Sequence, residues 1–345
     1  MIVRRLTGFA LALAIVLLVR PCEASCEEIS WDLRDVLREL VLARVGQAGP
    51  LAASQVDARL RGRGLPFTKP IFRFARGTNL ARVAVGEQPH DLAPCEVSEV
   101  FHDVPSPEGP VSVAAALRVE SAVLAFDAEE EPSAWRVLAR VREGVPLEAF
   151  EIVVGGPQGA ARRHALRREG STLRASVPRG ALEGPVTMQI VAQTPLGPEV
   201  IAELRTTTPT LAPEIVAPAP GARAESLIDA LNAARANLGV PKLQEDAALQ
   251  RFAERTLAAA VERGLLAHRT PEGLVAERLK AAHISTRRAG ELLARLAAGE
   301  PPAERFLASP AHRVIMGDPK LRSVGVAEGK GPDGLRWVVV VLTSP

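Results

Sequence analysis

The run Leu335-Arg336-Trp337-Val338-Val339-Val340-Val341-Leu342 decides the fold at the C-terminal end of this 345-residue chain. Its β-branched residues favour a strand, and the unbroken apolar run from Trp337 to Val341 predicts burial on both faces of a sheet. The turn Gly331-Pro332-Asp333-Gly334 precedes this run, and the short apolar stretch Ser323–Ala327 lies before the turn. The end of the chain is therefore predicted to be β-structure.

Helical patterns occupy the sequence before this β-structure. Apolar residues recur at helical spacing from Leu227 to Leu238 and from Leu249 to Val261, and a glycine follows soon after each stripe. Two shorter segments, 274–282 and 302–308, are also predicted as helices. The C-terminal unit is therefore expected to be a set of helices packed on a small sheet.

Short motifs follow one another through this unit in a fixed order. They are Leu231-Asn232-Ala233-Ala234-Arg235, Gly239-Val240-Pro241-Lys242-Leu243, Ala267-His268-Arg269-Thr270-Pro271-Glu272-Gly273, Arg278-Leu279-Lys280-Ala281-Ala282, Ala289-Gly290-Glu291, Ser309-Pro310-Ala311-His312-Arg313 with Ile315-Met316, Ser323-Val324-Gly325-Val326 and Trp337-Val338. In this order they resemble the CAP superfamily of cysteine-rich secretory, antigen 5 and pathogenesis-related proteins, in its short bacterial (SCP-like) form. The resemblance implies an α-β-α sandwich, the CAP fold, over residues 223–345.

The same resemblance implies a candidate metal site. In the family, two histidines and one or two glutamates line a shared cleft, and several members bind a divalent metal such as zinc there. The matching positions are His268, Glu291 and His312. Imidazole and carboxylate groups suit zinc, and three protein ligands leave a coordination position for water or a substrate. The alternative is a structural cluster in which imidazole N–H groups bind a carboxylate without metal.

Some positions depart from the family pattern. Leu292 replaces the asparagine of the glycine-glutamate-asparagine motif, Phe306 stands where bacterial members usually have tryptophan, and Ala311 replaces the glycine before His312. No second glutamate ligand is evident, because Glu304 is expected to be a solvated side chain.

The predicted function is binding rather than catalysis. Most members of the family bind sterols, other lipids or partner proteins outside the cell. No serine or cysteine nucleophile stands beside these histidines in a recognisable motif, and Ser309 is explained by the turn before His312, so no catalytic residue is assigned. We expect an exported protein whose cleft holds a divalent metal and a small or lipidic ligand or an envelope component. The alternatives are a zinc-dependent hydrolase or peptidase, with Glu291 as ligand or base, and a structural cell-envelope module.

The middle of the chain is predicted to be β-structure. Residues 129–206 contain short β-branched stretches separated by turns, which indicate an immunoglobulin-like β-sandwich. The stretches are Trp135–Val141, Phe150–Val154, His164–Arg168, Thr172–Val177, Val186–Thr194 and Val200–Arg205. The turns Gly155–Gly159 and Pro195–Pro198 loosely resemble those of such modules in bacterial surface proteins. Residues 207–222 carry four prolines and are predicted to be an extended linker.

The first part of the chain is predicted to be an export signal followed by a small α+β region. Residues 1–24 have two early arginines and an apolar stretch too short to span a membrane, which is typical of a secretory signal peptide. Residues 25–128 are an α+β region of unknown type with helices at 31–44 and 54–60. Cleavage after residue 24 leaves Cys26 and Cys95, and an even count in an oxidising compartment predicts a disulfide between them. Lipidation of Cys26 is the alternative.

The charge balance narrows the classes of partner. The formal charge of +2 comes from 42 basic and 40 acidic side chains, and residues 1–24 hold three of the basic ones and one of the acidic ones. The mature chain is therefore neutral, and a general affinity for nucleic acid is not expected. No later segment is apolar for long enough to span a membrane, and we expect a soluble protein in the periplasm or outside the cell. The oligomeric state is left open.

Overall fold

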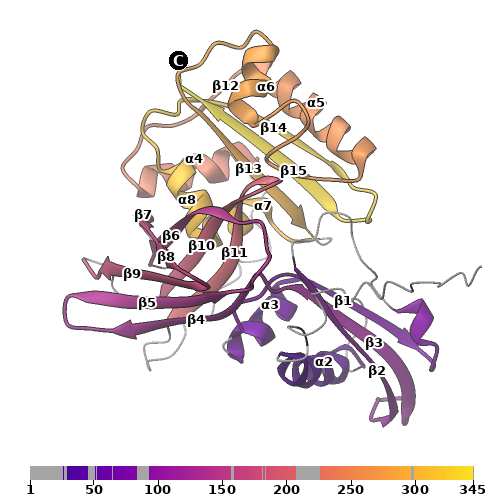
Figure 1. Cartoon of the computed structure of the whole chain (residues 1–345). Coiled ribbons are helices and arrows are strands. Elements are labelled where there is room, and N and C mark those ends of the chain that lie inside the picture. Colours follow the sequence, from indigo (N-terminus) through magenta and orange to yellow (C-terminus); the bar gives the residue numbers. More distant parts are fainter. Residues whose placement is uncertain are drawn as a thin grey trace, which may run out of the picture.

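The computed structural model describes residues 26, 29–45, 51, 53–63, 65–83, 93–156, 159–180, 182, 184–206, 226–296 and 299–344. Three units follow one another along the chain (Figure 1). The predicted signal peptide, residues 1–24, and the predicted linker, residues 207–222, lie outside the described residues. Among the described helices, none has the length and apolar character needed to cross a membrane.

The C-terminal unit contains one sheet, with strands in the order β12-β14-β15-β13. All neighbours are antiparallel except β12, which is parallel to β14. The strands are β12 (Gln244–Glu245), β13 (Ala289–Leu296), β14 (Ser323–Lys330) and β15 (Arg336–Thr343). The helices are α4 (Leu227–Asn237), α5 (Ala247–Arg263), α6 (Val275–Ala281), α7 (Pro302–Ala308) and α8 (Pro310–Met316).

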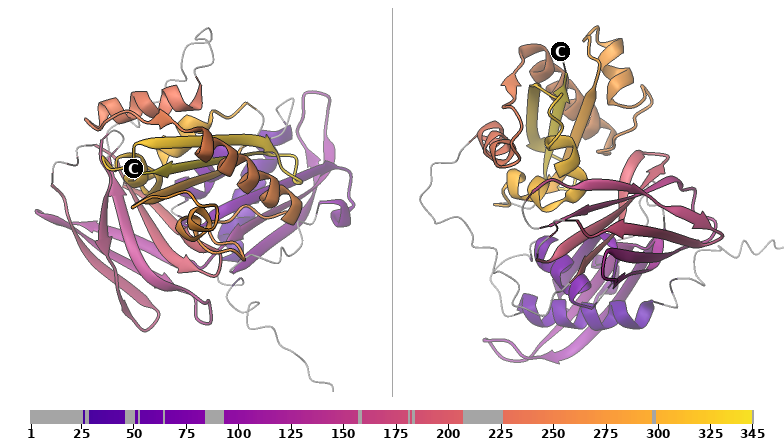
Figure 2. Two further views of the ribbon diagram at one scale, coloured as in Figure 1. Left: turned by 90° about the horizontal axis from the view of Figure 1, so that it is seen from above. Right: turned by 90° about the vertical axis from the view of Figure 1, so that its left-hand side faces the viewer.

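Strand β15 is buried on both faces, as the valine run predicts. Trp337, Val339 and Val341 belong to one apolar cluster with residues of α5 and α6. The alternate residues Val338, Val340 and Leu342 belong to a second cluster with residues of α4, α7 and α8. Helices therefore cover both faces of the sheet (Figure 2), and the expected α-β-α sandwich is confirmed.

The middle unit is a β-sandwich of two four-stranded antiparallel sheets, in the orders β4-β5-β9-β8 and β11-β10-β6-β7. Its strands are β4 (Val123–Glu130), β5 (Ala134–Val141), β6 (Glu148–Gly155), β7 (Arg162–Ala165), β8 (Arg167–Glu169), β9 (Thr172–Pro178), β10 (Val186–Thr194) and β11 (Gly197–Thr206). Two details differ from the sequence prediction. The sandwich starts at Val123, before residue 129, and the stretch His164–Arg168 divides into β7 and β8, which belong to different sheets.

The N-terminal unit is a three-stranded antiparallel sheet in the order β1-β3-β2, with two helices packed beside it. Its elements are α2 (Ser30–Val45), α3 (Ala53–Gly62), β1 (Thr68–Arg76), a short 3-10 helix (Leu80–Arg82), β2 (Pro94–Val104) and β3 (Val111–Glu120). One apolar stripe of α2 is fully buried against the sheet, because its leucines and valines recur at helical spacing.

The predicted disulfide is present: Cys26 and Cys95 are joined by an S–S bond, with their Cα atoms 5.5 Å apart. It ties the segment before α2 to the start of β2. A sulfur atom in a disulfide cannot carry a thioether-linked lipid, so this bond counts against the alternative in which Cys26 is lipidated.

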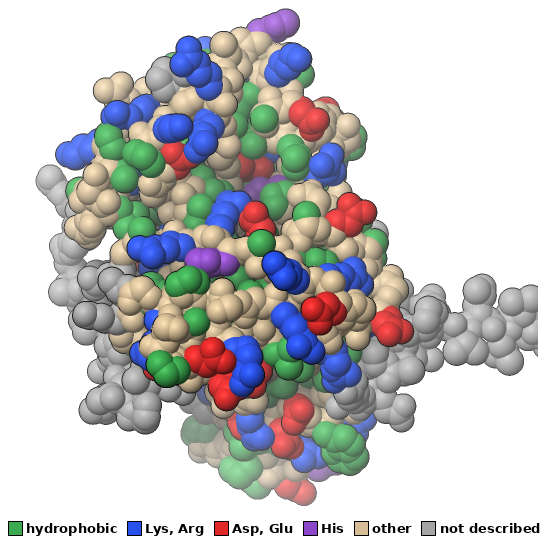
Figure 3. All heavy atoms as spheres, turned by 60° about the vertical axis from the view of Figure 1, so that its left-hand side comes forward, with side chains coloured by type: hydrophobic (Ala, Val, Ile, Leu, Met, Phe, Trp, Pro, Cys, Tyr) green, Lys and Arg blue, Asp and Glu red, His purple; other side chains and the backbone are tan. Residues whose placement is uncertain are grey.

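Ion pairs and hydrogen bonds join the three units. Arg305 of α7 pairs with Asp57 of α3, with Nη1 and Oδ2 3.2 Å apart. Lys69 of β1 pairs with Glu199 of β11 at 3.4 Å. On the face shown in Figure 3, basic side chains lie among acidic ones, in keeping with the chain's near balance of 42 basic and 40 acidic side chains.

Removing the disulfide should destabilise the N-terminal unit. The bond closes a loop with a sequence separation of 69 residues. Its loss in Cys26→Ser/Cys95→Ser should lower the free energy of unfolding by about 2–4 kcal/mol, because the unfolded chain gains conformational freedom. Calorimetric unfolding with and without reductant measures this. Reductant should lower the temperature of the first unfolding transition of the wild type and leave that of the double variant unchanged. Identical transition temperatures for the two proteins without reductant would contradict the prediction.

Candidate functional site

Glu291 lies on β13, at the edge of the C-terminal sheet. Strand alternation sets its direction: the preceding Gly290 faces Ile315 of α8, since a Cβ added there would lie 2.5 Å from the Ile315 side chain. Glu291 therefore points to the opposite face, toward α6. Only 2% of its side chain is exposed. A carboxylate this deeply buried needs partners for both oxygens.

Two side chains supply those partners. Arg278 of α6 donates from Nη2 to Oε1 of Glu291 at 2.7 Å, and its guanidinium lies 5.9 Å from the ring centre of Phe252. His268, in the loop before α6, lies with Nδ1 3.0 Å from Oε2. An ionised carboxylate only accepts hydrogen bonds, so Nδ1 carries a proton, and in the neutral form of His268 the lone pair lies on Nε2. About a fifth of the His268 side chain is exposed, at 22%.

His312 lies in the first turn of α8, which packs on the other side of the sheet. Its ring meets Phe306 edge to face, with centroids 5.1 Å apart. Its Nδ1 atom is buried without a hydrogen-bond partner. Burial, followed by the charges of His268 and Arg305, lowers the pKa of His312 to about 3. This imidazole is therefore neutral over the physiological pH range, with one ring lone pair that could bind a cation.

The structure thus joins His268 to Glu291 and leaves His312 separate from that carboxylate. Both oxygens of Glu291 already accept hydrogen bonds, and its direction on β13 is away from α8. Within the described part of the chain, no three His, Cys, Asp or Glu side chains gather as a metal-ligand set. These residues do not fit three direct ligands at His268, Glu291 and His312. They show one imidazole, His268, oriented by a carboxylate, which is a common arrangement behind metal-binding histidines.

A turn of the β-sandwich packs against the His268 loop. The backbone N–H of Arg269 donates to the carbonyl of Leu196, in the turn between β10 and β11, at 2.6 Å. At the next residue, Gly197, an added Cβ would lie 2.9 Å from Cβ of His268. Gly197 also has a φ of +102°, so glycine is required there on two counts. The sandwich therefore covers one side of the loop that carries His268.

The Ser309–Arg313 motif binds the sandwich as well. The hydroxyl of Ser309 and the backbone N–H of Ala311 both donate to Oε1 of Gln189, at 3.0 and 2.9 Å. Arg313 donates from Nη1 to the carbonyls of Gly156 and Gly159, at 2.7 and 3.2 Å. The serine hydroxyl is thus directed at a glutamine of β10, and the motif holds two units of the chain together.

Sequence reasoning missed two partners of the site. Arg278 stands in one of the quoted motifs, but no local pattern in the sequence pairs it with Glu291, 13 residues further on. Gln189 has no local signal, because it is one polar residue in a strand of another unit. The exposed Glu304 is a solvated side chain, as expected.

Comparison with known proteins identifies the family of the C-terminal unit. Residues 228–342 match the family described as "CAP: Cysteine-rich secretory protein family". The chain therefore contains a CAP domain at residues 228–342, which confirms the resemblance seen in the sequence. No curated protein sequence matches the chain significantly.

Solved structures give further matches. An outer surface protein from Borrelia burgdorferi is 20% identical, with a TM-score of 0.31, and the match covers 34% of this chain and 89% of that one. An extracellular SCP-domain protein from Bacillus anthracis is 14% identical, with a TM-score of 0.31 and coverage of 64% and 85%. A cysteine-rich secretory protein from Staphylococcus aureus is 12% identical, with a TM-score of 0.30 and coverage of 64% and 83%.

Removing the negative charge of Glu291 should destabilise the CAP domain strongly. Glu291→Gln leaves the Arg278 guanidinium buried without a counter-charge, which should cost roughly 3–5 kcal/mol of unfolding free energy. Urea unfolding measures the loss, with the exposed Glu304→Gln as the matched control. Adding Arg278→Met to Glu291→Gln should recover part of the stability. A loss in Glu291→Gln no larger than in the control would show that the ion pair contributes nothing.

The buried imidazole of His312 should make stability depend on pH. Because the folded pKa lies near 3, below the ordinary value of 6.5, only the unfolded chain takes up this proton between those two pH values. The contribution is complete above pH 6.5 and is lost as pH falls, by at most about 1.4 kcal/mol per pH unit. His312→Asn should flatten this part of the slope. Unfolding free energies of both proteins from pH 7 to pH 4 test this, and equal slopes would refute it.

Proposed function

We propose that this chain is an exported protein that acts by binding, with the cleft beside His268 and His312 as its binding site. Export is supported by the signal-like residues 1–24 and by the Cys26–Cys95 disulfide, which is stable in an oxidising compartment. The compartment is the periplasm or the outside of the cell.

One observation carries the choice of binding over catalysis: the carboxylate of Glu291 is neutralised by Arg278 and hydrogen-bonded by His268. A general base needs a lone pair directed at the proton that it removes, and both Glu291 oxygens already accept hydrogen bonds. The hydroxyl of Ser309 is likewise committed to Gln189. These contacts favour a role for Glu291 in fixing His268, and they weigh against a zinc-dependent hydrolase.

A divalent metal such as zinc would be held by the imidazoles of His268 and His312. Hydrogen bonding to Glu291 sets the tautomer of His268 and leaves its Nε2 able to bind a metal. Burial above all lowers the pKa of His312 and keeps it neutral, and a protonated His268 lowers that pKa further, which supports an electrostatic coupling between the two rings. Two protein ligands are few for zinc, and the remaining positions would belong to water or to a bound ligand. The metal would supply a cationic point of attachment for that ligand.

The ligand is a small or lipidic molecule or an envelope component. The β10–β11 turn limits the directions from which a ligand can approach His268, because Leu196 and Gly197 pack directly against the His268 loop. The site therefore belongs to the full chain, with walls from the CAP domain and from the sandwich. Tests of binding should use the mature chain with all three units.

Zinc titration of the mature chain by calorimetry tests this proposal. Wild-type protein should bind Zn²⁺ with a dissociation constant in the micromolar range or tighter, and His268→Ala and His312→Ala should each abolish the heat, because two imidazoles share the ion. His283→Asn is the matched control, since His283 is exposed and its φ of 57° suits asparagine.

Two further readouts separate the alternatives. Mass spectrometry of an organic extract of the purified protein should reveal a retained ligand that both alanine variants lose. Turnover of a peptide substrate that chelation abolishes and zinc restores would favour the hydrolase instead. Zinc binding that neither alanine variant weakens would contradict the assignment of the two histidines.

A further inference from the structure

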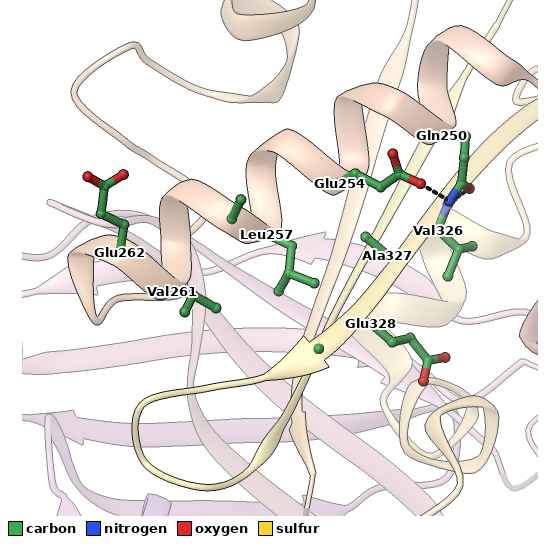
Figure 4. Close-up of a pocket in the computed structure, with 10 residues that line it drawn as sticks. Gln250, Glu254, Leu257, Val261, Glu262, Val326, Ala327 and Glu328 are labelled. Atoms are coloured by element: carbon green, nitrogen blue, oxygen red, sulfur yellow. Dashed lines mark hydrogen bonds between the residues drawn. The ribbon is translucent and has the colours of Figure 1, made fainter.

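A groove of about 570 Å³ lies between α5 and β14, at the edge of the C-terminal sheet (Figure 4). Its volume is within the range of ligand pockets, and it is open along its length. The residues that line it are Gln250, Glu254, Leu257, Ala258, Val261, Glu262, Val326, Ala327, Glu328 and Gly329. In the strand order β12-β14-β15-β13, this edge is opposite to β13, which carries Glu291. The groove is therefore separate from the site proposed above.

Strand β14 forms one wall of the groove, and on the edge away from β15 no strand of the described residues pairs with it beyond its first two residues. Strand β12 pairs with β14 only at Ser323 and Val324. Beyond that point the backbone N–H of Val326 donates to the side-chain carbonyl of Gln250 at 3.1 Å. This bond shows that Val326, and by alternation Glu328, turn their main-chain groups away from β15 and toward the open edge. Gln250 thus occupies the place that a carbonyl of an added strand would take.

The side chains around this edge define the chemistry of an occupant. Leu257, Val261 and Ala327 form an apolar floor, while the carboxylates of Glu254, Glu262 and Glu328 stand at the rim. No lysine or arginine is among the lining residues. Arg336 approaches Glu328, with 3.5 Å between Nη1 and Oε2, from outside that lining. The groove therefore offers backbone hydrogen bonds, apolar contact and negative charge together.

We propose that this groove binds an extended, basic peptide segment of a partner protein, which adds to β14 as a further strand. Successive side chains of such a segment point to opposite faces. One set would rest on Leu257 and Val261, and lysine or arginine side chains would reach the glutamates at the rim. Because the N–H of Val326 already donates to Gln250, the added strand would bond to the carbonyl of Val326 and to the main-chain groups of Glu328. These bonds would supply affinity and the charges would supply selectivity, as in other cases of strand addition. This interaction is additional to the cleft function and does not depend on it.

Charge decides between a basic partner and a second copy of the chain. Pairing two β14 edges would bring the rim glutamates of both copies close together, and like charges across paired strands are destabilising. A basic segment meets the same carboxylates with complementary charge, which also speeds association at low salt.

Fluorescence anisotropy with labelled peptides tests the proposal on the mature chain. The probe is an alternating Lys-Val peptide of about six residues, a length that suits a short strand edge. Glu254→Gln/Glu262→Gln should weaken its binding by roughly three- to tenfold, as expected for two exposed charge pairs. Glu304→Gln, an exposed glutamate of the same domain outside the groove, is the matched control and should have no effect.

Peptide variants separate strand addition from simple charge attraction. N-methylation of alternate peptide bonds should abolish binding, because it removes the donors that face β14. An alternating Glu-Val peptide should not bind. The proposal is overturned by equal binding of the methylated peptide, by equal binding to the double variant, or by self-association of the protein that the double variant strengthens. Zinc binding is unaffected by any of these results, so the two proposals stand or fall separately.

Discussion

Burial of β15 on both faces is the constraint on which the rest of the CAP domain depends. Its alternate side chains enter two separate apolar clusters, one below α5 and α6 and the other below α4, α7 and α8. Each layer of helices is therefore fixed by the same strand. Pairing with β15 also fixes β13, and places Glu291 opposite Val341. The position of the candidate site is thus set by a run of fully buried valines.

The ion pair between Glu291 and Arg278 shows how such a buried site is maintained. Each group is costly to bury alone, and together they satisfy each other inside the sheet-and-helix core. His268 completes the set and is the member nearest to solvent. The cluster therefore has two buried members, Glu291 and Arg278, and one partly exposed ring, that of His268. Hydrogen bonding to the buried carboxylate holds this imidazole in a defined orientation.

Sequence reasoning succeeded where local pattern and fold agree. The valine run, the stripes of α2 and α5, and the even cysteine count each have a direct physical meaning in isolation. It missed β13, because Ala289–Leu296 is composed of residues that favour helices and becomes a strand through pairing with β15. Motif order groups Glu291 with His268 and His312, but it does not reveal which face of a strand a side chain occupies. Gln189 and Leu196 act across units, and such contacts leave no trace in local sequence.

The hydrogen bonds of Arg313 to Gly156 and Gly159 of the sandwich have a consequence for how the chain works as a whole. Because both partners belong to one polypeptide, their association is intramolecular, and covalent tethering supplies an effective concentration on the order of millimolar. Contacts too weak to hold two free proteins together can therefore keep the sandwich seated on the CAP domain. A protease cut between residues 206 and 226 would remove that advantage. One peptide bond would then control whether the wall beside His268 stays in place.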